Sequence, residues 1–345
     1  MKKIIICALL ISLQACAQKR KKTTSTIKQL SEMKAEDVNS ENIVDYISSK
    51  VKIYKKNPMY VIRPVQNSCV YEILVNDYPI DQNYSLRKLA TPIEINRAIL
   101  KSGPQTITYR LYPLGDLMVD TYGKGETITT LLKNTTMNIE VIKYEDVKTG
   151  TGIDDEIVVT QHTSATKKDS KEFIGAGLPY YEYTFTFNAK VPYKNKGWSN
   201  GQDLTKFDKK ELEAAVVKKC EYLKKLYLEK NIEKLIQVEY LQSMGEDIAT
   251  YKEKNKVKSY WEQYLEFVNL EDKDFQPLEG YEMYFFGKGK IVALRHSSIA
   301  PPDPRLRGES ALYFLYNVGD GIRALFKGAF LYLPEGEPLE NLQML

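Results

Sequence analysis

Residues 181–189 read YEYTFTFNA, and this stretch alternates strictly between aromatic and polar side chains. The aromatic members, which share one face of an extended chain, are Tyr181, Tyr183, Phe185 and Phe187. The polar members, on the other face, are Glu182, Thr184, Thr186 and Asn188. This two-residue period predicts a β-strand with one buried face, as in an antiparallel sheet.

Working outward from this strand, residues 55–193 consist of short β-favouring runs separated by turn residues. The runs lie at 70–75, 92–100, 106–112, 137–144, 157–161 and 181–189. Breaks such as Lys101-Ser102-Gly103-Pro104 supply the turn chemistry between them. At least six strands without a helical period predict an all-β sandwich over 55–193. Residues 92–113 resemble the closing hairpin region of jelly-roll or Ig-like accessory modules, which bind sugars or proteins or support neighbouring domains.

After a polar loop at residues 194–201, the period becomes helical. Asp208 followed by Glu211 is typical of a helix start. The apolar spacing then predicts a helix from Asp208 to about Tyr227 and two more near 232–242 and 257–268. Strands are expected at 281–286, 290–295, 311–316 and 324–333. This order predicts an α+β domain over 200–345, helices first and an antiparallel sheet second. It resembles the NTF2-like group, whose curved sheet leaves a pocket, and that group includes both enzymes and ligand binders.

The first residues indicate where the protein goes. Lys2 and Lys3 precede an apolar run at residues 4–13, which is about half the roughly 20 residues that a membrane-spanning helix needs. The sequence Leu13-Gln14-Ala15-Cys16 follows. It resembles the lipobox of bacterial lipoproteins, which implies a signal over 1–16, a lipid on Cys16 and a cell-envelope protein facing the periplasm or the cell surface. The alternative is cleavage after Ala17, which would release a soluble secreted protein.

Residues 17–54 are expected to form a polar tether between the lipid and the folded body. Lys19-Arg20-Lys21-Lys22 begins this stretch, and mostly polar residues follow. Such a segment has too little apolar surface to offset the entropy cost of ordering. The basic cluster would either lie against anionic lipid headgroups or stay solvated.

Composition restricts the body to an ordinary globular protein. The 345 residues are 43% hydrophobic and 27% charged, and removing Lys2 and Lys3 with the signal lowers the formal net charge from +4 to about +2. A nearly neutral chain argues against nucleic acid as a partner. The 25 tyrosines are scattered, which favours a β-rich protein over a concentrated aromatic binding surface. Cys69 and Cys220 are expected to be separate buried thiols, with a disulfide as the alternative.

No catalytic, metal-binding or cofactor-binding signature is present in the sequence. The two histidines restrict acid–base chemistry near neutral pH. His162 is interpreted as an exposed loop residue, and His296, Ser297 and Asp303 are too weak a pattern to indicate a catalytic triad. A cationic rim able to grip a carboxylate or phosphate is a further hypothesis, with a solvated loop as the alternative. Its residues are Arg295, His296, Arg305 and Arg307.

These observations favour a membrane-tethered, non-catalytic binding or interaction module with a protein partner. One version is an immunity-type lipoprotein that captures an incoming toxin. The first alternative is an envelope enzyme that acts on a glycan with carboxylates of the α+β domain. The second alternative is a structural component of an envelope assembly.

Overall fold

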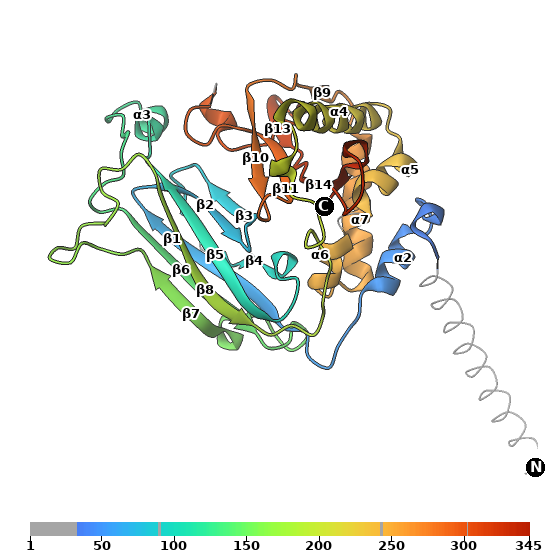
Figure 1. Cartoon of the computed structure of the whole chain (residues 1–345), viewed down its shortest axis with the longest axis horizontal. Helices are drawn as coiled ribbons and strands as arrows, with labels where there is room; N and C mark the ends of the chain where they lie inside the picture. Colours follow the sequence, from blue (N-terminus) through green and yellow to red (C-terminus); the bar gives the residue numbers. More distant parts are fainter. Residues whose placement is uncertain (1–32, 89–90, 242–243, 302) are drawn as a thin grey trace, which may run out of the picture.

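The structure is a computed structural model that describes residues 33–88, 91–241, 244–301 and 303–345. In this part of the chain, the strands form four antiparallel sheets, and helices pack beside them (Figure 1). The expectation of antiparallel sheet combined with helices is therefore confirmed. Cys16 and the lipobox-like sequence lie outside the described residues.

The first two sheets contain four strands each. One sheet has the order β4-β1-β6-β7, with bounds Ile93–Glu94, Met59–Asn67, Thr136–Tyr144 and Ile157–Thr163. The other has the order β3-β2-β5-β8, with bounds Tyr78–Asn83, Val70–Val75, Gly103–Tyr112 and Tyr181–Ala189. A short helix, α3 (Leu117–Tyr122), follows β5.

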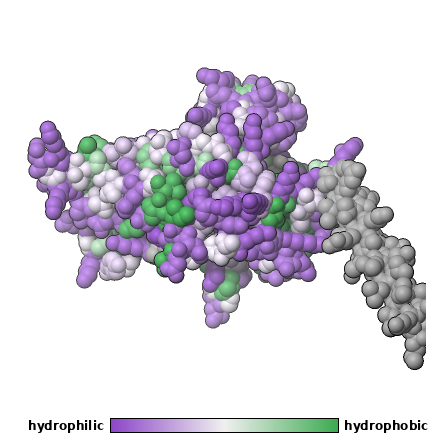
Figure 2. All heavy atoms as spheres, turned by 90° about the horizontal axis from the view of Figure 1, so that it is seen from below, coloured by the Kyte–Doolittle hydropathy of each residue, from purple (hydrophilic) through white to green (hydrophobic). Residues whose placement is uncertain are grey.

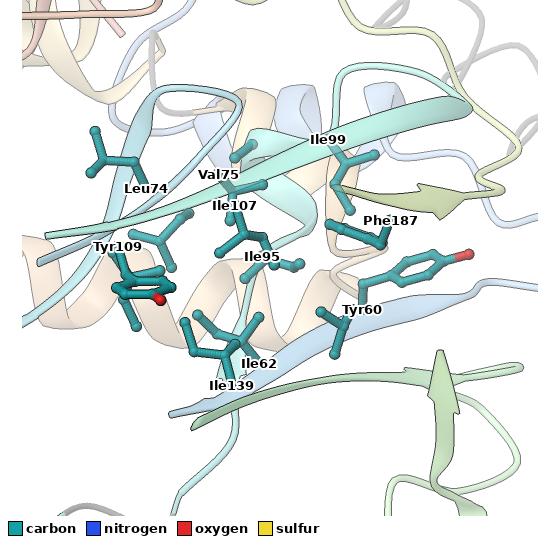
Figure 3. Packing of buried hydrophobic residues seen from close by; sticks show 14 of the residues in the cluster. Tyr60, Ile62, Leu74, Val75, Ile95, Ile99, Ile107, Tyr109, Ile139 and Phe187 are labelled. Atoms are coloured by element: carbon teal, nitrogen blue, oxygen red, sulfur yellow. The ribbon is translucent and has the colours of Figure 1, made fainter. Parts of the chain in front are cut away.

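Side chains from both sheets meet in one hydrophobic core. Ile62 of β1 and Ile139 of β6 belong to the same buried cluster as Ile107 and Tyr109 of β5. Figure 3 shows these side chains between the two layers of strands. Ile107, Tyr109 and Leu111, the apolar positions at two-residue spacing in one of the expected strands, are fully buried in this core.

The run at 92–100 is a strand only at Ile93–Glu94, because a 3-10 helix follows at Asn96–Ala98. Ile95 and Ile99 are nevertheless fully buried in the core. The amide of Asn96 explains this turn. It accepts from the Tyr60 backbone N–H at 2.8 Å and donates to the Pro58 and Ala249 carbonyls at 3.0 Å. Short-range periodicity alone does not reveal such a long-range bond.

The second half of the chain begins with helices. Their bounds are α4 Lys209–Leu228, α5 Ile232–Leu235, a π-helix at Ile236–Tyr240, α6 Met244–Ala249 and α7 Lys254–Asn269. The Asp208 carboxylate accepts the backbone N–H groups of Lys210 and Glu211 at 3.0 and 3.1 Å, so the predicted cap is confirmed.

Two more antiparallel sheets complete the chain. One has the order β10-β11-β14-β15, with bounds Tyr281–Phe286, Ile291–His296, Leu331–Tyr332 and Gln343–Met344. The other has the order β13-β12-β9, with bounds Gly321–Phe326, Tyr313–Val318 and Asp274–Phe275. The single strand expected at 324–333 is wrong: the chain leaves β13 at Phe326 and re-forms sheet only at Leu331. The residues between them line the cavities described below.

Both cysteines of the body are free and buried, as expected. Cys69 lies in the tight connection between β1 and β2, and Cys220 lies on the buried face of α4. Burial raises the pKa of each thiol to about 12, so both stay protonated and unreactive at neutral pH.

Part of the segment that is expected to be a polar tether forms a helix. Residues Ile43–Lys50 form α2, which lies beside α7 (Figure 1). Ile43 and Ile47 are completely buried against Val257 and Trp261 of α7. The tether expected over 17–54 is therefore wrong for these residues, because Ile43, Tyr46 and Ile47 form an apolar stripe that packs on α7.

The two halves of the chain share buried residues. Phe286 of β10 and Ile291 and Ala293 of β11 belong to the same core cluster as residues of β2 and β5. The turns of two hairpins also bond to each other: the Gly287 N–H donates to the Asp77 carbonyl at 2.8 Å, and the Lys288 N–H donates to the Asp77 carboxylate at 2.6 Å. The sheets of the second half are thus packed directly against the β2–β3 hairpin.

The outer edge of this assembly is formed by β7 and β8. Seen from below, the molecule is mostly hydrophilic, with small apolar patches between charged side chains (Figure 2). Ile157 and Val158 of β7 are exposed, and Tyr183 of β8 is 41% exposed. The aromatic face of β8 is therefore well buried only toward Phe187, because β8 is an edge strand.

Candidate functional site

A cavity of about 320 Å³ lies where the β2–β3 hairpin meets β10, β11 and the segments at 308–310 and 326–330. We call it the seam cavity. Cavities of this size at the junction of two packed parts are the usual location of small-ligand sites. Its charged lining residues are Glu72, Asp81, Arg97, Arg295 and Glu309.

Two strands without an exposed face bring charge into this cavity. All six residues of β2 are buried, since one face of the strand packs on the core and the other on the second half of the chain. All six residues of β11 are buried as well. Glu72 of β2 and Arg295 of β11 are therefore charged groups in an almost dry setting, with only 4% and 6% of their surfaces exposed. Such groups need partners.

The Glu72 carboxylate receives a full set of donors. The hydroxyls of Tyr84, Ser298 and Tyr112 donate to it at 2.6, 2.9 and 3.1 Å. Arg295 and Arg110 add ion pairs at 3.5 and 3.6 Å. Both oxygens of the carboxylate are thus occupied.

The electrostatic result is a Glu72 side chain that is charged at neutral pH. Burial by itself raises the pKa of this carboxyl, but Arg295 and the Tyr84 hydroxyl outweigh burial, and the pKa ends below its ordinary value. A carboxylate that is ionised and bonded on both oxygens has no proton to give and no free lone pair for attack. We therefore assign Glu72 a structural role at the cavity.

Arg295 is fixed from several sides. Its Nε donates to the Gly308 carbonyl at 2.8 Å, its Nη2 donates to the Gln82 side chain, and its guanidinium lies 5.4 Å from the Tyr284 ring centre. Gly308 has a φ of +67°, and a Cβ there would lie 2.3 Å from the Tyr84 ring. Only glycine brings its carbonyl to Arg295 in this position.

Two other carboxyl groups at the cavity, those of Asp81 and Glu309, have fewer partners than that of Glu72. Asp81 accepts from the Tyr71 hydroxyl at 2.8 Å, and Glu309 accepts from the Gln82 amide at 3.2 Å. Burial raises the pKa of both groups above the ordinary value. Each can therefore both donate and accept hydrogen bonds at mildly acidic pH.

Arg97 contributes an unsatisfied donor. Its Nη2 donates to the Ile80 carbonyl at 3.0 Å, and its Nη1 lies 3.7 Å from a Glu246 oxygen. Its buried Nε has no hydrogen-bond partner among the described residues. A donor left over beside a polar cavity is a group that a ligand oxygen can satisfy.

The residues expected to form a cationic rim are divided between β11, which carries Arg295 and His296 on opposite faces, and the segment after it, which carries Arg305 and Arg307. Arg295 lines the seam cavity, and Arg307 lies beside it, with its Nε donating to the Ser298 carbonyl at 2.6 Å and its guanidinium 5.0 Å from the Tyr84 ring centre. Arg305 is exposed and pairs with Asp303 at 2.6 Å. The structure thus brings Arg295 and Arg307 together around Glu72 and leaves Arg305 outside.

His296 points away from this cluster. It is buried, its Nδ1 lies 3.0 Å from the Gly280 carbonyl, and its Nε2 has no hydrogen-bond partner within the described residues. The other histidine also differs from expectation. His162 lies within β7, where its ring stacks on Tyr183 and Phe185 at 4.8 and 4.6 Å.

Several residues that line the seam cavity were not predicted from the sequence. Glu72 is a single acid in the apolar run Val70–Val75, and that contrast is a usable signal. Asp81 and Arg97 have no feature in the neighbouring sequence that distinguishes them from other charged residues.

Among the described residues, no group of histidine, cysteine and carboxylate side chains is arranged to hold a metal ion. None of the helices there is long and apolar enough to span a membrane.

Comparisons with protein-family models, with curated proteins and with solved structures found no match to this chain. The functional argument therefore rests on the geometry of the seam cavity and on the sequence.

Proposed function

We propose that this protein is an exported lipoprotein of the bacterial envelope, tethered through Cys16, whose body binds a small polar ligand without converting it. In this proposal, a β-sandwich module and an α+β module together form the ligand site at the seam cavity. The lipobox-like sequence supports the location, and the seam cavity supports the binding role.

The observation that carries the binding role is the way in which charge is arranged around the cavity. Glu72 is fully bonded, and Arg295 is fixed by Gly308, Gln82 and Glu72. Groups held this firmly form a preorganised polar surface, which lowers the entropy cost of binding. They do not provide the free proton or free nucleophile that catalysis requires.

The charges also indicate the kind of ligand. Three carboxyl groups and two guanidinium groups line the cavity, and the pKa of Asp81 and that of Glu309 are raised by burial. An anionic ligand would meet the carboxylates, and a cationic one would meet the guanidinium groups. We infer an uncharged ligand with several hydrogen-bonding groups. Phe286, Phe326 and Phe330 add apolar contact area beside these groups.

This cavity favours a small ligand over the immunity-type version, in which a toxin would cover a broad surface. It equally favours a ligand binder over a purely structural envelope component, which needs no polar cavity.

The location is tested by mass spectrometry on protein isolated from its native membrane fraction. We expect an N-terminal cysteine at position 16 carrying a diacyl or triacyl modification. An unmodified soluble chain that begins at Gln18 would contradict the tether and favour secretion.

The binding site is tested by thermal shift measurements with a panel of neutral saccharides, neutral amino-acid amides and nucleosides. We expect at least one compound to raise Tm by several degrees, as saturating ligands do. Arg97→Ala should abolish this increase, because Arg97 supplies the free donor. Arg323→Ala, which removes an exposed arginine on β13 outside the cavity, should leave it unchanged. Equal effects of both variants, or no shift with any compound, would contradict a ligand site at the seam.

One observation favours a second candidate, an envelope glycosidase. Asp81 and Glu309 face the same cavity, and burial raises the pKa of each, as for a general acid. Only Glu309 belongs to the second half of the chain. This candidate predicts release of new reducing ends from a glycan, lost in Glu309→Gln, whereas the binding proposal predicts no product.

A further inference from the structure

A second cavity, of about 480 Å³, lies next to the seam cavity on the side of the helices. Its lining comes from the π-helix, α6, α7 and the segment at 325–328. We call it the helical cavity.

Lys327 forms one end of the helical cavity. Its ammonium pairs with Glu239 of the π-helix and lies 5.2 Å from the Tyr227 ring centre and 5.5 Å from that of Phe267. The Tyr227 hydroxyl donates to the same Glu239 carboxylate at 2.7 Å. A π-helix turn is often found at functional sites, and here it carries the carboxylate that holds Lys327.

Lys252 forms a second charged group of the same kind. Its ammonium lies 2.9 Å from an Asp247 oxygen, 3.4 Å from a Glu246 oxygen and 4.1 Å from the Tyr260 ring centre. Burial raises the pKa of Asp247, although Lys252 opposes this. The helical cavity thus repeats the features of the seam cavity: paired charges, a buried carboxyl group and aromatic rings.

The two cavities adjoin. Phe326 and Gly328 line both of them. Arg97 of the seam cavity also pairs with Glu246 of the helical cavity across 3.7 Å. Residues 326–328 and the Arg97–Glu246 pair therefore lie between two polar, ring-lined spaces, and at Gly328 this boundary carries no side chain.

We propose that the seam cavity and the helical cavity form one cleft that binds a neutral oligosaccharide of several sugar units. Sugar hydroxyls donate to carboxylates and accept from guanidinium and ammonium groups, and the C–H faces of sugar rings pack on aromatic side chains. Each cavity is lined by carboxylates, aromatic rings and one kind of cation, guanidinium groups in the seam cavity and ammonium groups in the helical cavity, with acidic and basic residues nearly balanced. This inference rests on the proposed function, because it names the ligand class of the same site.

Isothermal titration of the mature chain with chito-oligosaccharides and cello-oligosaccharides of one to six units tests this. For at least one series, we expect Kd to fall about tenfold or more between two and four units, or about 1.4 kcal/mol, as the second cavity fills. Gly328→Leu should remove this gain, because its side chain would occupy the space between the two cavities. A Cβ at Gly328 would lie 3.2 Å from the Phe330 ring, so this ring has to shift slightly to accommodate the substitution.

Gly321→Leu is the matched control, because Gly321 lies on β13 with its nearest contact at 3.7 Å and lines neither cavity. It should keep the full dependence on chain length. A length dependence that survives in Gly328→Leu would overturn the single cleft. Equal affinities for all chain lengths would also overturn the single cleft. In that case, loss of binding in Arg97→Ala would still support the seam site. If no sugar of any length binds but another neutral compound gives an Arg97-dependent Tm shift, the oligosaccharide is wrong and the proposed function stands.

Discussion

Glu72 carries a charge inside a strand whose other five side chains are apolar or aromatic and all buried. Taking this carboxylate out of water is costly, and the cost is offset only because Tyr84, Tyr112, Ser298 and two arginines surround it. Since Tyr84 and Tyr112 come from the first half and Ser298 and Arg295 from the second, this single residue links the two halves.

Replacing Glu72 with glutamine should lower the free energy of unfolding by about 3 kcal/mol or more at pH 7, because Arg295 loses its buried counter-charge. The folded-state pKa of Glu72 is below its ordinary value of 4.5, so its stabilisation is complete above that pH and is lost as the pH falls through the folded pKa. Urea unfolding should therefore show a difference between wild type and variant that shrinks on acidification below about pH 4.5.

Glu262→Gln is the control for this measurement. Glu262 is exposed on α7 and pairs only with Lys258, at 3.6 Å. Such a surface pair is worth about 0–1 kcal/mol. If Glu72→Gln is as mild as this control, the carboxylate is not the buried link that the contacts indicate.

Glu309 should show the opposite pH dependence. Burial raises its folded-state pKa above 4.5, so the wild type binds its proton more tightly when folded and loses stability as the pH rises through this range. Glu309→Gln cannot ionise. We therefore expect the variant to gain stability relative to wild type between pH 4 and pH 7 in urea unfolding. A relative loss of stability over that range would mean that the ionised form of Glu309 is the favoured one.

For single residues, the sequence indicates which side chains are charged but not which residues surround them in the fold. Arg295, one of the four residues proposed for a cationic rim, lines the seam cavity. Its partners Gln82 and Glu72 lie more than 200 positions away in the chain, so spacing could not reveal them. His296 and Arg305 are near neighbours of Arg295 in sequence, but alternation along β11 and the course of the following loop place them elsewhere.

At the element scale, α2 is the helix whose role differs most from expectation. Ile47→Ala should lower the free energy of unfolding by about 2–4 kcal/mol, because Ile47 is completely buried against α7. Ile53→Ala changes an exposed isoleucine just after α2 and should cost less than about 0.5 kcal/mol. Denaturant unfolding measures both. Equal small effects would show that residues 43–50 behave as the tether that composition indicates.

The π-helix carries Glu239, whose carboxylate pairs with the Lys327 ammonium. Glu239→Ala leaves the Lys327 ammonium partly buried among Tyr227, Tyr264 and Phe267 without its carboxylate. We expect a loss of about 3–5 kcal/mol in the free energy of unfolding. The double variant Glu239→Ala with Lys327→Met removes the unpaired charge and should recover part of this loss. No recovery would mean that Glu239 acts through its bond to Tyr227 alone.

Elements with strong local patterns were predicted well. α7 and the β10–β11 hairpin follow the expected periods closely, because each has a clear apolar face or a Gly-rich turn. The single strand expected at 324–333 does not form. The chain leaves β13 at Phe326, and the residues before β14 begins at Leu331 line the two cavities. β8 is a strand as expected, but its aromatic face is only partly covered, and strand alternation does not say which strand lies at an edge.

At the scale of the whole molecule, the core does not divide at the loop where the sequence pattern changes. Phe286, Ile291 and Ala293 are buried with residues of the first two sheets, and Asn96 bonds directly to α6 through Ala249. Composition and length indicate two parts, and the structure packs them through a shared cluster. Sequence patterns report the faces of single elements and not which faces meet.

This shared core predicts one cooperative unfolding transition for residues 33–345. Scanning calorimetry should give a single peak with the van't Hoff enthalpy close to the calorimetric enthalpy. Two separable peaks, each lost in variants of only one half, would contradict a continuous core.

The most direct test of the central claim is hydrogen–deuterium exchange of the mature chain with and without saturating chitotetraose and, separately, cellotetraose. We predict that at least one of these sugars slows exchange in residues 72–82, 293–295, 308–310 and 326–330, which contain the lining of the seam cavity. Protection confined to β7 and β8, where Tyr183 and His162 form an aromatic edge, would contradict it and move the ligand site to the outside of the first two sheets.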